Sequence, residues 1–120
     1  MELYEYTVHE LMDMLEKNEI KSEDIVKSYF DRIKEKDPEV KAYVSTLENE
    51  ALEKARKVDE DRKAGKTVSK LAGIPIGIKD NMCIKGTKTT CSSKMLENFV
   101  APYNATVIEK INEENVIPLG

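Results

Sequence analysis

The deciding stretch of this sequence is Leu71-Ala72-Gly73-Ile74-Pro75-Ile76-Gly77-Ile78-Lys79-Asp80-Asn81, an apolar run that ends abruptly in a polar cluster. Its β-branched and small apolar residues predict a buried strand over residues 74–79. Pro75 has no amide donor for a sheet ladder, so we expect it at the start of that strand or on an edge. Because ligands of α/β proteins bind outside the carboxyl ends of the strands, the polar residues after this strand are candidate functional groups.

Lys79 is the first of these candidates, and its position allows two interpretations. A lysine held against an apolar strand end would be partly desolvated, which makes the amine usable as a base. A surface lysine that marks where the strand leaves the core is the alternative, and the residue pattern alone favours it. Asp80 is predicted to be a turn residue that accepts hydrogen bonds from the backbone of the following loop.

Two helices are expected before the strand. Thr7 and Glu10 fit a capping box that starts the first helix, with an apolar stripe at helical spacing. Ser22 is predicted to cap the second helix, and Pro38 to end it, because the residue before a proline is pushed out of helical geometry. The residues expected to face the core are Val8, Leu11, Met12 and Leu15, then Val26, Tyr29, Phe30 and Ile33.

The rest of the chain alternates strand and helix signals. We expect a strand at 42–46, a polar helix at 49–64 stopped by Gly65, a short helix capped by Ser92, and a helix capped by Asn104 that ends near Asn115. A further strand begins at Val116. Strands that alternate with helices predict an α/β fold with a mostly parallel sheet.

Composition narrows the functional classes. The chain has 120 residues, 40% of them hydrophobic and 35% charged, with a net charge of −4, which gives no support for direct nucleic-acid binding. We expect a cytoplasmic protein, because the acidic start lacks a signal-peptide core and no apolar run is long enough to span a membrane. Cys83 and Cys91 do not have zinc-site spacing, and the glycines form no phosphate-binding loop, so no metal or cofactor is expected on this chain.

Three segments together resemble the amidase signature family. They are residues 73–81, then Lys85-Gly86-Thr87-Lys88-Thr89-Thr90-Cys91-Ser92-Ser93, then residues 93–107 with Tyr103-Asn104-Ala105-Thr106-Val107. Within that family the sequence is most similar to the A subunits of glutamyl-tRNA(Gln)/aspartyl-tRNA(Asn) amidotransferases. The resemblance implies the N-terminal part of one α/β/α amidase domain with a mixed, mostly parallel sheet. In that domain, residues 1–38 would form a helical hairpin, and residues 39–120 the start of the α/β core.

The resemblance also implies a Ser–cis-Ser–Lys catalytic triad in which Lys79 is the lysine. The two serines would lie in a Gly/Ser-rich segment that these 120 residues do not contain, so we expect the chain to be inactive alone. A hydroxyl-rich loop would support the lysine from nearby: Thr89, Thr90, Cys91 and Ser92. Capping a short helix and satisfying the loop backbone explains these residues equally well. Ser92, Ser93 and Cys91 are rejected as nucleophiles because no histidine is near them in sequence.

The implied activity is hydrolysis of glutamine to supply ammonia for converting Glu-tRNA(Gln) to Gln-tRNA(Gln), a hydrolase half-reaction within a ligase of protein biosynthesis. The B and C subunits of the amidotransferase would be the partners in a heterotrimer, and tRNA would be bound mainly by a partner. ATP and Mg would be used by the complex, with nucleotide binding outside this chain. Two alternatives stay open: part of a free-standing amidase of small amides, and a non-catalytic helical module that docks onto a partner through its first two helices.

Overall fold

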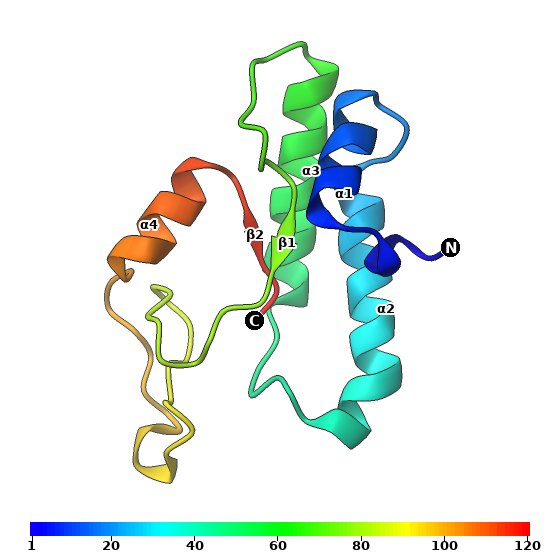
Figure 1. The fold of residues 1–120 in the computed structure, drawn as a ribbon. Coiled ribbons are helices and arrows are strands. Elements are labelled where there is room, and N and C mark those ends of the chain that lie inside the picture. The colour runs from blue at the N-terminus through cyan, green and yellow to red at the C-terminus, as the bar shows by residue number, and fades with distance from the viewer.

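Four helices and two short parallel strands make up the computed structural model, which describes residues 1–120. The helices are α1 (Val8–Glu16), α2 (Ser22–Val40), α3 (Glu48–Lys63) and α4 (Thr106–Glu113), and the strands are β1 (Pro75–Ile76) and β2 (Ile117–Pro118). Two short 3₁₀ turns, η1 (Leu3–Glu5) and η2 (Lys94–Leu96), complete the secondary structure. In Figure 1, α1, α2 and α3 lie on one side of the strands and α4 lies on the other, which confirms the α/β class.

The main core lies between the strands, α2 and α3. It contains six buried side chains: Val26, Phe30, Ala51, Ala55, Ile117 and Leu119. The small alanines on α3 let that helix approach both α2 and the sheet closely, so the polar helix still buries one narrow apolar stripe. A second cluster joins α1 to the chain just before β1: Leu11, Leu15, Ile25 and Ile74. The predicted helix stripes are therefore confirmed at their centres, while Val8 at the start of α1 is exposed.

The sheet is a single parallel pair in which Pro75 faces Ile117 and Ile76 faces Pro118. Its hydrogen bonds extend beyond the two named residues of each strand. Leu119 N donates to Ile76 O at 2.8 Å, and Ile78 N donates to Gly120 O at 2.8 Å. Pro75 opens β1, as its missing amide donor predicts. The strand is shorter than the expected 74–79, because the chain continues past Ile76 with only one further bond to β2.

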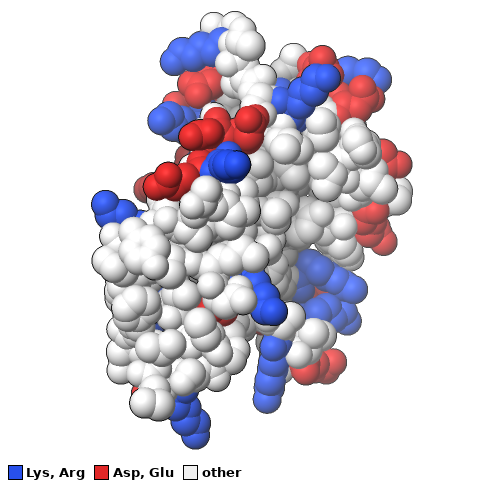
Figure 2. Space-filling model, turned by 60° about the vertical axis from the view of Figure 1, so that its left-hand side comes forward, with Lys and Arg blue, Asp and Glu red and all other residues white.

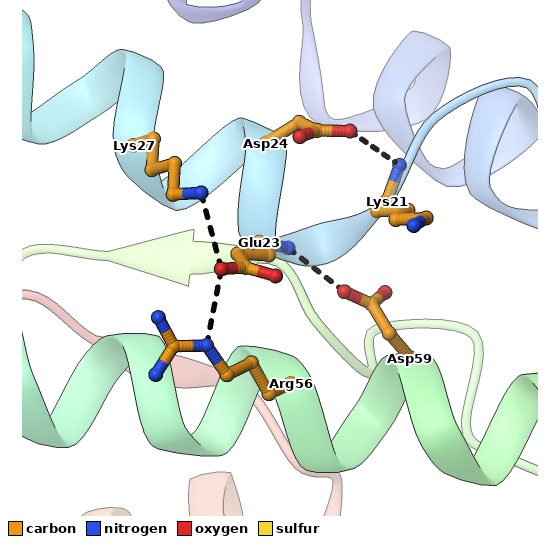
Figure 3. A network of polar contacts seen from close by, with 6 residues as sticks. All are labelled: Lys21, Glu23, Asp24, Lys27, Arg56 and Asp59. Atoms are coloured by element: carbon orange, nitrogen blue, oxygen red, sulfur yellow. Dashed lines mark hydrogen bonds and ion pairs between the residues drawn. The ribbon is translucent and has the colours of Figure 1, made fainter.

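The predicted start of α1 is confirmed, whereas the predicted cap of α2 is wrong. Thr7 and Glu10 form the expected capping box. Ser22 is not the cap of α2 but its first residue; it is buried, and its Oγ donates to Gly73 O at 2.7 Å. Asp59 of α3 supplies the cap instead, since its carboxylate accepts from the amide of Ser22 at 2.7 Å and from the amide of Glu23 at 3.0 Å. Figure 3 shows the second of these bonds.

The end of α2 also differs from the prediction. Pro38 lies inside the last turn and the helix continues to Val40. A proline there removes one helical donor near an exposed end, which the packed helix tolerates. Lys41 ends the helix with a φ of 56°, and Asp37 Oδ1 accepts from Ala42 N at 2.7 Å. By contrast α3 covers nearly the predicted range and is followed by Gly65 with a φ of 75°.

Three further predictions are wrong. Residues 42–46 form no strand, because Leu47 N alone bonds to the sheet, at 2.8 Å to Leu119 O, and most of the segment is exposed. Ser92 caps no helix; Ser93 precedes the short turn η2 and accepts from Met95 N. Asn104 does not cap α4, because its Oδ1 accepts from Lys85 N at 2.7 Å and ties two loops together.

The surface is unevenly charged. The side of the molecule with α4 and residues 82–105 is turned forward in Figure 2, where broad areas carry no charged side chain. Several large apolar side chains are exposed in this part of the chain: Met95, Phe99, Val100, Tyr103 and Val107. No helix combines the length and the apolar character that a membrane crossing requires.

Candidate functional site

A hollow of about 400 Å³ opens beside the end of β1. Its walls come from residues 42–47 before α3, from residues 77–92 after β1, and from Gly120 after β2, and we call it the Lys79 hollow. The two strands are parallel, so their carboxyl ends meet at this edge. This is the edge at which open α/β sheets bind ligands.

Tyr43 is a wall residue whose place in the site the sequence did not indicate. A Cβ added to Gly77 would lie 3.1 Å from the Tyr43 hydroxyl oxygen, so the glycine lets the ring approach the main chain after β1. Burial raises the pKa of Tyr43, and the charge of Asp37 adds to this effect. The phenol therefore stays protonated at neutral pH and available as a hydrogen-bond donor at the wall. Its only sequence signal was an aromatic residue in the short segment 42–46 that was expected to be a strand.

Lys79 lies in the wall of this hollow, three residues beyond β1. Its backbone oxygen accepts from Met82 N at 3.0 Å, which closes a turn directly after the strand. The side chain is exposed, and none of the ion pairs in the structure includes it. The structure thus places the lysine at a sheet edge beside a hollow, while the expected desolvation is not provided by these 120 residues.

Asp80 has the turn role predicted for it. Its Oδ1 accepts from the backbone amide of Thr90 at 3.1 Å, its Oδ2 accepts from the Thr90 hydroxyl, and its backbone oxygen accepts from Cys91 N at 2.8 Å. The bond to the Thr90 hydroxyl goes beyond the prediction, because it links two side chains ten residues apart. The chain after Lys79 is therefore fastened to the hydroxyl-rich loop.

The four residues of the hydroxyl-rich loop separate into two pairs. Thr89 and Thr90 are buried, at 4% and 6% exposure, and Thr89 N donates to Phe99 O at 3.1 Å. Cys91 and Ser92 are exposed and have φ values of 50° and 57°. Ser92 alone of the four lines the Lys79 hollow. A neighbouring hollow of about 360 Å³ is lined by both Thr90 and Ser92.

Lys88 is a second cation on the wall, and it shares both hollows with Ser92. It belongs to the motif that carries the family resemblance, although no separate feature of the sequence selects it. No group of three or more His, Cys, Asp or Glu side chains is close enough to hold a metal ion. Both cysteines are free, Cys91 exposed and Cys83 half-buried. The polar groups of the hollow are therefore amines, hydroxyls, backbone groups and the carboxylate of Asp80.

Comparison with known proteins gives a consistent family match. The family model described as Amidase matches residues 24–120. The chain is 52% identical over 120 residues to the A subunit of the glutamyl-tRNA(Gln) amidotransferase of Thermoanaerobacter pseudethanolicus, covering 100% of this chain and 24% of that protein. It is 51% identical to the A subunit of the same name from Caldanaerobacter subterraneus, over 100% of this chain and 24% of that protein. The chain thus spans about a quarter of the length of these curated relatives.

The fold comparison agrees with the sequence comparison. An amidase family protein from Bacillus anthracis superposes with a TM-score of 0.88 and is 31% identical, covering 99% of this chain and 24% of that one. A likeness this close in both backbone and sequence extends over nearly every element described above, including both strands and the loops around the hollow.

Proposed function

The chain belongs to the amidase signature family, and we propose that it is the N-terminal quarter of the A subunit of a glutamyl-tRNA(Gln) amidotransferase. The observation that carries this proposal is identity of about half of all residues to subunits of that name over the whole chain. The exposed apolar side chains of Met95, Phe99 and Tyr103 support it too, because large exposed apolar side chains are typical of a surface that packs against further parts of a domain.

The proposed reaction is hydrolysis of the side-chain amide of glutamine to glutamate and ammonia. A serine hydroxyl attacks the amide carbonyl, ammonia leaves, and water hydrolyses the resulting acyl-enzyme. Lys79, in its neutral form, accepts the proton that a second serine relays from the nucleophile, and returns it to the leaving nitrogen. Both serines would come from a Gly/Ser-rich segment that is not among these 120 residues. The position of Lys79 in the wall of the hollow is what supports this role for the lysine.

The other components of the reaction are proposed to lie outside this chain. Ammonia would pass to the B and C subunits, where Glu-tRNA(Gln) is amidated with ATP and Mg. The excess of acidic over basic residues, 23 against 19, supports tRNA contact through a partner rather than through this chain. We place the complex in the cytoplasm, where tRNA charging occurs.

The first experiment replaces Lys79 with alanine in the full-length protein and measures glutamine hydrolysis by the assembled complex. Loss of a positioned proton-transfer group should lower kcat by about 10²–10⁴-fold. Lys70→Ala is the matched control, because Lys70 is an exposed lysine that precedes β1 in the chain and does not line the Lys79 hollow. An unchanged kcat in Lys79→Ala would refute the proposed role.

A free-standing amidase is the second candidate, favoured by the 31% identity to an amidase family protein of Bacillus anthracis. The two proposals differ in assembly and in coupling. An amidotransferase component should co-purify with the B and C subunits and form Gln-tRNA(Gln) from glutamine, whereas a free-standing amidase should hydrolyse small carboxamides alone. Full activity on small amides with no bound partner would favour the second candidate.

A further inference from the structure

Several hydrogen bonds join Asp80 to the loop at residues 90–92. Asp80 uses both carboxylate oxygens on Thr90, and its backbone oxygen accepts from Cys91 N. The Thr90 hydroxyl in turn accepts from Ser92 N at 3.2 Å. A continuous hydrogen-bonded path therefore runs from Asp80 through Thr90 to Ser92, and Thr90 is only 6% exposed, so water competes little for these bonds.

The carboxylate does not serve as a charge partner for a lysine. No ion pair in the structure involves Asp80, and all the bonds that its carboxylate accepts come from Thr90. Lys79 is its neighbour in sequence, yet the ammonium makes no hydrogen bond to it. The hydrogen bonds of Asp80 therefore fix the path of the chain after Lys79.

The loop that Asp80 holds has an unfavourable backbone. Cys91 and Ser92 are consecutive residues with φ values of 50° and 57°, in the left-handed region that residues with a Cβ seldom adopt. Two such residues in a row persist only where the surroundings impose them. Ser93 N donates to Thr90 O at 2.8 Å and closes a turn around this pair, while the bonds that Asp80 accepts from Thr90 and Cys91 fasten the turn to the chain after Lys79.

We propose that Asp80 is a positioning residue for amide hydrolysis: its bonds to the loop at residues 90–92 hold Lys79 and Ser92 on the wall of one hollow. Lys79 directly precedes Asp80, and Ser92 directly follows Thr90 and Cys91, the two residues that bond to Asp80. Both Lys79 and Ser92 line the Lys79 hollow. This inference rests on the proposed function, since it assumes that Lys79 takes part in the reaction. Displacement of a reacting group by about 1 Å can cost about 10²-fold in rate. Hydrogen bonds that fix Asp80 therefore limit the movement of the neighbouring Lys79.

The test uses the full-length protein in its complex and measures glutamine hydrolysis. Asp80→Ala should lower kcat by about 10²-fold and leave KM within about twofold, because geometry at the reacting group changes while substrate binding does not. Asp80→Asn retains an oxygen that can accept from Thr90 N, so it should recover most of the lost rate. The double variant Asp80→Ala/Thr90→Val should lose less than the two single losses combined, because both changes break the bond from the Thr90 hydroxyl to Asp80.

The control is Asp59→Ala, which removes another carboxylate that accepts backbone amides but lies at the start of α2. It should lower thermal stability and leave kcat of the folded enzyme unchanged. The pH profile separates positioning from charge. With Asp80→Ala the acid limb of kcat should stay where it is, whereas a shift of that limb to lower pH would make Asp80 a charge partner of Lys79 and overturn the proposal.

The outcomes for the two proposals are distinguishable. If Lys79→Ala keeps its activity, the proposed function fails. If Lys79→Ala is inactive while Asp80→Ala matches the parent enzyme, only the positioning role fails. Should Asp80→Ala not fold, Thr90→Val decides, because it keeps the shape of the buried side chain and removes only the hydroxyl. A lower kcat at unchanged KM in Thr90→Val supports the positioning role of Asp80, and a kcat equal to that of the parent enzyme overturns it.

Discussion

Gly73→Ala is expected to destabilise the protein through a single close approach. Gly73 has a φ of 86°, which costs a residue with a Cβ about 1–2 kcal/mol. The new Cβ would lie 2.8 Å from Ser22 Oγ and 2.9 Å from Ser22 Cβ, so the two segments must separate. Separation breaks the buried bond from Ser22 Oγ to Gly73 O, which adds about 1–3 kcal/mol. The total loss should be about 2–5 kcal/mol.

Urea unfolding followed by far-UV circular dichroism measures this loss in the purified protein that contains the chain. Gly65→Ala is the matched control, because Gly65 has a φ of 75° with nothing within 4 Å of the added Cβ, so only the backbone cost of about 1–2 kcal/mol applies. In a Ser22→Gly background the difference between the two alanine variants should shrink to the cost of the remaining 3.3 Å contact between the new Cβ and Val58. Equal losses for Gly73→Ala and Gly65→Ala in the parent background would refute the packing argument.

Two further predictions concern the polar network drawn in Figure 3. Asp59→Ala should cost about 0.5–2 kcal/mol by removing the acceptor for the first amides of α2, and Asp59→Asn should cost less; equal urea midpoints for the two variants would contradict a capping role. Lys27 and Arg56 hold the pKa of the Glu23 carboxyl below its ordinary value, so this carboxyl stabilises the fold above its unfolded pKa and loses that contribution as the pH falls through the lower folded value. In an NMR titration, Arg56→Ala should raise the pKa of Glu23, and an unchanged midpoint would show that the ion pair has no effect.

The parts of the fold that could be predicted from the sequence are those decided within a few residues. The capping box of Thr7 and Glu10 depends on groups three residues apart, and the structure has it as expected. The central residues of the helix stripes were predictable for the same reason. Ser22 has the local pattern of a cap, with acidic residues following it. Its hydroxyl instead bonds to Gly73, which is 51 residues away, and no local pattern contains that information.

The strand expected at residues 42–46 failed for a related reason. Its β-branched and aromatic residues match the pattern of a strand, but a strand also needs a neighbour with free backbone groups. In the structure Tyr43 packs toward Gly77 and Leu47 N bonds to the end of β2, so the segment crosses the sheet edge as a wall of the hollow. The strand propensity of residues 42–46 identified a segment that packs against the sheet. It could not distinguish such a segment from a strand that is hydrogen-bonded into the sheet.

In the candidate site, too, the features decided by nearby residues were predictable, and those decided by distant contacts were not. The position of Lys79 beside the end of β1 follows from the apolar run before it, and its neighbour Asp80 was predictable as a turn residue. The contact between Asp80 and Thr90 was not predictable, because the loop between these two residues must fold back before they can meet, ten residues apart in the chain. Ser92 lies in the wall of the hollow, and both Cys91 and Ser92 have left-handed geometry, a conformation that their residue types disfavour. Where local preference and observed conformation disagree beside a candidate catalytic group, the tertiary contacts that hold the segment are the feature to test, and here Asp80 makes those contacts by accepting from Thr90 and Cys91.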